Sequence, residues 1–168
     1  ADPRLVKAMR RGIDGDRAMR LLDRVRGRLP DAAFRTSLIV GFPGEGRREF
    51  AALRRFVAAA RFDHLGVFAY SPERGTPAFA LGDPVPAEVK EDRVREIMEL
   101  QSRISEAKNA ARVGRTIEVL VEGPDAERPG LWAGRGRFQA PEVDGVVRFS
   151  PGAGRAEPLS PIVRVEVT

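Results

Sequence analysis

The sequence predicts an α/β unit over residues 1–112 followed by a small antiparallel β-barrel over residues 113–168. Two observations carry this prediction. In the first part, an apolar strand pattern, a glycine-rich turn, an amphipathic helix pattern and a second apolar strand pattern follow one another, which is the order of a βαβ unit with parallel strands. After Val113 the apolar period changes to two, and short strand patterns alternate with turns rich in glycine and proline, as in small barrels.

The first part is expected to contain two short helices, two strands with a helix between them, and one long helix, over residues 3–11, 16–28, 34–40, 47–60, 62–70 and about 86–112. The nearly continuous apolar end of the first strand predicts burial on both of its faces. A polar connection, residues 71–85, leads to the long helix. The buried stripe expected on that helix is Ile97, Leu100, Ile104, Ala107 and Ala111.

The second part is expected to contain four strands, over residues 117–121, 131–137, 145–149 and 162–167. In the first of them, Ile117, Val119 and Val121 alternate with Thr116, Glu118, Leu120 and Glu122. This alternation is the pattern of a strand with one buried and one solvated face.

The composition excludes several kinds of chemistry. The chain has 168 residues and no cysteine, so it can form no disulfide, thiolate zinc site or cysteine-ligated iron–sulfur cluster of its own. No apolar run approaches the roughly 20 residues that span a bilayer, and the first residues lack the apolar core of a signal peptide. We therefore expect no membrane association and a cytoplasmic location.

The net charge of +5 is unevenly distributed. Residues 1–112 carry 22 basic and 16 acidic side chains, whereas residues 113–168 carry 7 and 8. The arginines of the first part are best explained as solvated helix faces. The second part is not basic, which argues against a general grip on phosphate backbones there.

The strongest candidate site is the segment Ile39, Val40, Gly41, Phe42, Pro43, Gly44 and Glu45, at the carboxyl end of the first strand. Ligands bind at this end of parallel strands, and two glycines allow a close backbone approach to a nucleotide-like molecule. An ordinary strand-to-helix turn with Glu45 near the helix N-terminus is the alternative. The lysine and hydroxyl residue of a phosphate loop are missing.

Other polar residues lie on or beside the two strands. Arg35 and Ser37 either point into the interior of a barrel, near the candidate site, or form a polar cluster at the sheet edge. The sequence leaves both interpretations open. Tyr70 and Ser71 end the second strand. They either line the opening at the carboxyl ends of the strands or serve as a core residue and a capping residue, respectively. His64, the single histidine, is expected to be a packing or surface residue, and no catalytic residue and no metal ligand is assigned.

The segment 139–145 of the second part is an acidic loop that contains a proline. It is either a plain hairpin connection or a recognition loop. As a recognition loop, its two carboxylates, Glu142 and Asp144, suit a basic partner.

Several segments together resemble a known family. Segments 5–12, 39–45, 68–71 and 75–78, with the sequences LVKAMRRG, IVGFPGE, FAYS and GTPA, are similar to the C-terminal part of the radical-SAM methylthiotransferases. In that family a TRAM barrel follows, as the alternating tail does here, and the similarity runs through almost the whole chain. Segment 139–145, QAPEVDG, resembles the RimO branch, which modifies an aspartate of the twelfth small-subunit ribosomal protein.

The resemblance implies an open, partial TIM-like radical-SAM barrel over residues 1–112 and a TRAM barrel over residues 113–168. It implies S-adenosylmethionine as a cofactor and two four-iron four-sulfur clusters in the full-length parent, whose cysteines would lie upstream of this chain. By motif, the residues near the adenosyl group would be Arg35, Ser37, Ile39, Gly41, Phe42, Pro43, Gly44, Glu45, Tyr70 and Ser71.

The resemblance also implies a transferase reaction in the parent, in which a methylthio group is added to the aspartate β-carbon, while this chain alone is expected to be inactive. The TRAM domain would dock the basic ribosomal protein through Gln139, Pro141, Glu142 and Asp144. A tRNA-adenosine methylthiotransferase fragment and a non-catalytic RNA-binding TRAM module are the alternatives.

The sequence departs from the family pattern at one turn. Gly46 replaces the threonine that usually follows the Gly-Glu pair, so the next helix lacks a side-chain cap. A half barrel would also expose strand edges and apolar faces. We therefore expect the isolated chain to dimerise or to be marginally stable.

Overall fold

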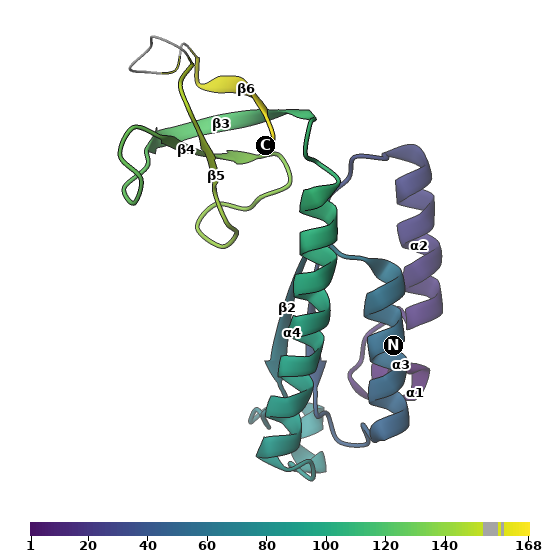
Figure 1. The fold of residues 1–168 in the computed structure, drawn as a ribbon. Coiled ribbons are helices and arrows are strands. Elements are labelled where there is room, and N and C mark those ends of the chain that lie inside the picture. Colours follow the sequence, from purple (N-terminus) through teal and green to yellow (C-terminus); the bar gives the residue numbers. More distant parts are fainter. Residues whose placement is uncertain (153–157, 159) are drawn as a thin grey trace. The chain divides into compact units, whose positions relative to one another are not determined.

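The computed structural model describes residues 1–152, 158 and 160–168, and the chain divides into two compact units, Ala1–Ala107 and Lys108–Thr168. Figure 1 shows the order of the elements along the chain. The first unit contains most of the helices and a parallel strand pair. The second is built from β-strands.

The first unit contains the predicted βαβ arrangement. Its elements are α1 (Pro3–Ala8), α2 (Gly15–Arg28), β1 (Arg35–Val40), α3 (Arg47–Ala60), β2 (His64–Ala69), the 3₁₀ helix η1 (Pro77–Leu81) and α4 (Ala87–Ala110), which continues into the second unit. Strands β1 and β2 pair in parallel, with Arg35 opposite His64 and Val40 opposite Ala69. Helix α3 connects them.

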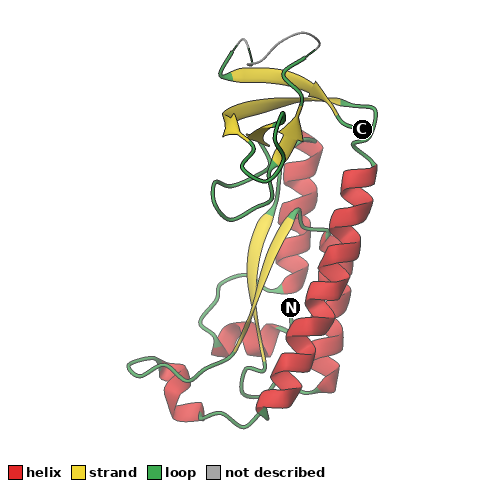
Figure 2. Ribbon diagram, turned by 60° about the vertical axis from the view of Figure 1, so that its left-hand side comes forward, coloured by secondary structure: helices red, strands yellow, loops and turns green. Residues whose placement is uncertain are grey.

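The core of this unit lies between the strand pair and the long helices. The apolar stripe of α3 is buried, with Val57 fully so, and it packs with Val40 of β1 and Ile97 of α4. Figure 2 shows the long helices on one side of the two strands. The stripe predicted for α4 is only partly correct, because Ile97 and Ile104 are buried whereas Leu100 is half-buried and Ala107 and Ala111 are exposed.

The opposite face of the strand pair is open among the described residues. Burial alternates along β1, so that Ile39 is 41% exposed while Val40 is completely buried. Phe68, the register partner of Ile39 on β2, is 59% exposed. Burial on both faces of β1 was therefore the wrong prediction for this chain. The exposed apolar face that a half barrel would show is present.

The connection after β2 is more ordered than the sequence suggests. Residues 71–85 were expected to be a plain polar connection, but they contain η1. Pro77 stands in the first turn of η1, where a missing N–H costs nothing. The side chains of Phe79 and Leu81, also in η1, are about half exposed.

The second unit is a curled antiparallel sheet. Its strands are β3 (Thr116–Pro124), β4 (Trp132–Gly136), β5 (Val147–Phe149) and β6 (Ile162–Glu166), in the order β5-β4-β3-β6. Val119 and Phe149 are its buried apolar side chains. Within the described part of the chain, β5 and β6 form the two edges of the sheet, and the strands build a half-barrel, which fits the small antiparallel β domain that was expected. No helix among the described residues is long and apolar enough to cross a membrane.

Candidate functional site: two loops at the carboxyl ends of the parallel strands

The glycine turn that follows β1 needs its glycines for two different reasons. Gly41 has φ +75° and Gly44 has φ +91°, in the left-handed region that side chains with a Cβ rarely adopt. Gly41 is also buried, and a Cβ there would lie 2.4 Å from Cγ of Lys90. Gly44 is exposed and leaves the backbone of the turn open to solvent.

The Glu45 side chain points into the protein. Its Oε1 accepts hydrogen bonds from the backbone N–H of Gly41 and from Nη1 of Arg93, both at 2.8 Å, and Arg93 also donates to the Glu45 carbonyl at 3.1 Å. Burial raises the pKa of Glu45, while these donors and the Arg93 charge oppose the rise. Glu45 therefore closes the turn on itself and ties it to α4.

The loop after β2 is joined to the same turn. The Tyr70 ring packs edge-on against Phe42, with the centroids 5.1 Å apart, and both side chains are buried. Tyr70 Oη donates to the Ala78 carbonyl at 3.0 Å. Lys90 Nζ donates to the Tyr70 carbonyl at 2.9 Å and to Asp83 Oδ2 at 2.6 Å. Phe42 and Tyr70 thus shape the two loops from inside.

The open face of the strand pair presents three cross-strand rows, whose members are Arg35 with His64, Ser37 with Gly66, and Ile39 with Phe68. The rows change from polar to small to apolar toward the carboxyl ends. The middle row has small residues, and the Phe68 ring leans over it, since a Cβ on Gly66 would lie 3.5 Å from Cε2 of Phe68 and 3.7 Å from Oγ of Ser37. Such a face can take a planar apolar group at one end and polar groups further along.

The structure thus divides the ten residues predicted to lie near an adenosyl group. Arg35, Ser37, Ile39, Gly44 and Ser71 are exposed, Pro43 is half-buried, and Gly41, Phe42, Glu45 and Tyr70 are buried. All of them belong to the strand pair or to its two carboxyl-end loops. Arg35, Ser37, Ile39 and Ser71 therefore have exposed side chains, and Gly44 exposes its backbone.

Helix α1 supports the glycine turn from another side. Cδ2 of Leu5 lies 3.4 Å from the position of a Cβ on Gly44, and Arg4 donates to Glu49 Oε1 at 2.8 Å. Gly46 has no side chain to cap α3, but Glu49 Oε2 accepts from its backbone N–H at 3.0 Å. Leu5, the first residue of the segment 5–12, therefore lies beside the glycine turn.

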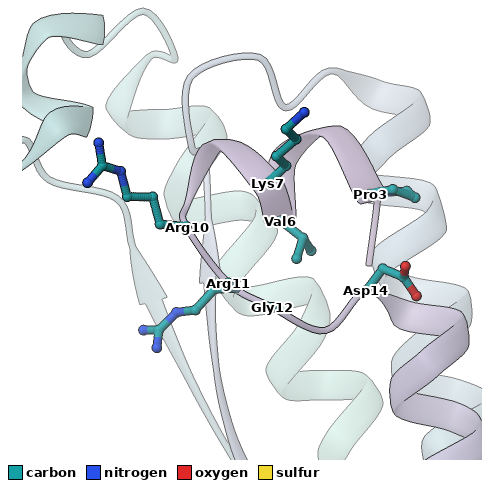
Figure 3. A pocket seen from close by; sticks show the side chains of 7 residues that line it. All are labelled: Pro3, Val6, Lys7, Arg10, Arg11, Gly12 and Asp14. Atoms are coloured by element: carbon teal, nitrogen blue, oxygen red, sulfur yellow. The ribbon is translucent and has the colours of Figure 1, made fainter.

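A shallow pocket of about 360 Å³ lies beside α1, and its lining residues are Pro3, Val6, Lys7, Arg10, Arg11, Gly12 and Asp14. Figure 3 shows that the Lys7, Arg10 and Arg11 side chains point away from one another. Their charges do not converge on one point, so the pocket has no built anion site.

In the second unit, two residues predicted to contact a partner, Gln139 and Asp144, hold the predicted recognition loop in shape. Gln139 Oε1 accepts from the Gly136 N–H at 2.8 Å and its Nε2 donates to the Gly145 carbonyl, while Asp144 Oδ2 accepts from the Ala140 N–H at 2.6 Å. Glu142 is exposed, with φ +61°, and Pro141 is exposed beside it. The neighbouring Val143 is 72% exposed.

Sequence reasoning missed Lys90 and Arg93, which are only 5% and 8% exposed. A signal for them exists. Arg93 lies four residues and Lys90 seven residues before Ile97, so both continue the apolar stripe of α4 toward its N-terminus. Two cations on a buried stripe indicate internal partners.

The described residues contain no group of three or more His, Cys, Asp or Glu side chains that could hold a metal ion. With no cysteine in the chain, an iron–sulfur cluster does not fit this part of the molecule.

Comparisons with known proteins found a domain match and several similar proteins. Residues 113–168 match the model of the TRAM domain. Similar proteins named "Ribosomal protein uS12 methylthiotransferase RimO" come from Aquifex aeolicus, 46% identical over 165 residues, from Anaeromyxobacter sp. (strain K), 49% over 165, and from Gloeobacter violaceus, 43% over 166.

These matches cover 98%, 98% and 99% of this chain but only 38%, 34% and 37% of the relatives. The chain thus spans little more than a third of their length. The chain belongs to the RimO family, as the part of such a protein that carries the TRAM domain.

Proposed function

We propose that this chain is the C-terminal part of a radical-SAM methylthiotransferase that adds a methylthio group to the β-carbon of an aspartate in the ribosomal protein uS12. The observation that carries the proposal is the identity of 43–49% over nearly the whole chain to proteins named for this reaction. We also propose that the protein acts in the cytoplasm. Methylthiolation of a tRNA adenosine is the second candidate.

The strand face and its loops fit part of a site for S-adenosylmethionine. The apolar row of Ile39 and Phe68 suits the adenine ring, and Ser37 offers a hydroxyl in the next row. The exposed backbone at Gly44 offers polar groups at the carboxyl end. When bound, S-adenosylmethionine supplies the methyl group and the radical that removes hydrogen from the substrate.

The two four-iron four-sulfur clusters of such an enzyme need ligands from outside this chain, because the chain has no thiol. Most of the length of the relatives also lies outside it. We propose that this remaining length carries the clusters and supplies further strands beside β1 and β2. Those strands would complete a TIM-like barrel over the open Ile39 and Phe68 face, and the chain alone would be inactive.

We propose that the TRAM domain docks the ribosomal protein. Its near balance of 7 basic and 8 acidic side chains suits a basic protein better than a phosphate backbone. The loop tip with Glu142 and Val143 is the surface we assign to this contact, while Gln139 and Asp144 hold the loop in shape. RNA binding by the same domain is the alternative.

The test is a binding titration of the 168-residue chain with uS12 and, separately, with tRNA at several salt concentrations. We expect Glu142→Lys to weaken uS12 binding and the matched charge reversal Glu166→Lys, on exposed β6 surface, to leave it unchanged. Equal effects of the two substitutions would contradict the assigned loop. Tighter binding of tRNA, with a steep salt dependence, would overturn the choice of partner.

A further inference from the structure

Helix α4 carries two cations inside the first unit. Lys90 and Arg93 are 5% and 8% exposed, whereas the Arg95 side chain on the same helix is 65% exposed and pairs with Asp92 at the surface. Lys90 and Arg93 are three residues apart, so they lie on the same face of the helix. That face is turned toward the two loops.

The two cations contact both loops at the carboxyl ends of the strands. Arg93 reaches the turn after β1 through the side chain and the carbonyl of Glu45. Lys90 reaches the loop after β2 through the Tyr70 carbonyl and Asp83. The Lys90 stem also fills the space that a side chain on Gly41 would need. One turn of helix therefore fixes the relative position of the two loops.

Stability alone does not explain these residues. Buried ion pairs lose hydration on folding, and well-packed apolar residues in their place are often as stable or more so. What a buried pair with defined hydrogen bonds adds is a defined geometry. We propose that Lys90 and Arg93 are positioning residues of the adenosyl site: they hold the two loops in the arrangement that binds the cofactor. This inference rests on the proposed function.

The experiment is a calorimetric titration of the full-length parent protein with S-adenosylmethionine, well below the thermal midpoint of each variant. We expect Arg93→Met and Lys90→Met each to weaken binding about tenfold, the scale of losing one charged hydrogen bond. The control is Arg95→Met on the outer face of α4, which should bind as the wild type does. Arg93→Lys keeps the charge, and we expect it to restore part of the affinity.

Hydrogen exchange adds a readout that does not depend on activity. Amides of residues 41–46 should exchange faster in Arg93→Met and should be unaffected in Arg95→Met. If substitution merely lowered global stability, the affinity of the folded protein would stay at the wild-type value. Wild-type affinity in the folded Met variants would therefore overturn the inference.

The wild-type titration separates a failure of the proposed function from a failure of the positioning role. If the wild-type protein does not bind S-adenosylmethionine, the proposed function itself fails. If a Met variant does not fold, Arg93→Lys or Lys90→Arg replaces it, because each keeps the buried charge and changes the geometry of the hydrogen bonds. Unchanged affinity in the replacement variant would then contradict the positioning role of that residue.

Discussion

Replacing Gly41 with alanine should destabilise the first unit through two separable effects. The backbone at Gly41 has φ +75°, which a residue with a Cβ adopts only with strain. The new Cβ would also lie 2.4 Å from Cγ and 2.9 Å from Cδ of Lys90, which is 5% exposed and held by two hydrogen bonds. Lys90 can yield only by giving up its contacts with Tyr70 or Asp83.

The two effects have different magnitudes. The left-handed conformation costs a residue with a Cβ about 1–2 kcal/mol. Overpacking of a filled interior adds about 1–3 kcal/mol. Gly75 isolates the first effect, because its φ is +85° and a Cβ there would meet nothing within 4 Å. We therefore expect Gly41→Ala to lose about 1–3 kcal/mol more than Gly75→Ala.

The assay is urea unfolding followed with two probes. Far-UV circular dichroism reports mainly the first unit, which contains most of the helical residues, and the fluorescence of Trp132 reports the second. Gly41→Ala should lower the midpoint seen by circular dichroism. An equal loss of stability in Gly41→Ala and Gly75→Ala would refute the packing of Gly41 against Lys90.

Three further substitutions have expected outcomes. Gly46→Ser should stabilise the protein by about 0.5 kcal/mol in thermal unfolding, because the serine hydroxyl would cap α3 and the backbone at this position is extended. A loss of stability would mean that Glu49 Oε2, 3.0 Å from the new Cβ, cannot move aside. Phe68→Ser should reduce self-association of the 168-residue chain in light scattering, and an unchanged mass would show that the open face does not cause it. Burial would raise the pKa of Asp125, but hydrogen bonds from the Glu127 N–H, Arg148 and the Arg128 N–H outweigh it and hold that pKa below its ordinary value. The ionised Asp125 side chain therefore stabilises the fold above its ordinary pKa, and this stabilisation is lost as the pH falls through the lowered pKa. Acid unfolding followed by Trp132 fluorescence should lose part of its pH dependence in Asp125→Asn. An unaltered pH profile would contradict the role given to Asp125.

The parallel strand pair and its connecting helix could be predicted because each follows from a local pattern. The apolar stripe from Phe50 to Ala60 has the helical period, and the glycine turn ends the first strand. The exposure of Ile39 could not be predicted from the run that contains it. Whether an apolar strand has one or two covered faces depends on what packs against it, and the sequence around β1 does not contain that information.

The buried cations were missed for a related reason. Along the sequence, Lys90 and Arg93 look like the solvated charges that most helix arginines are. Only the packing of α4 against the two loops gives them internal partners. The loop of residues 139–145 shows the same limit, since its acidic character was recognised but the inward hydrogen bond of Asp144 depends on the turn geometry.

In both loops, the residue with the most recognisable chemistry builds the loop rather than facing outward. Glu45 binds the backbone of its own turn and Arg93, and Asp144 binds the Ala140 N–H. In the function we propose, contacts with a ligand or a partner therefore fall to exposed neighbours such as Ile39 and Glu142. Substituting Glu45 or Asp144 would still weaken binding, because the loop would lose its shape. Loss of binding at these two positions thus shows a contact only if hydrogen exchange of the loop amides is unchanged.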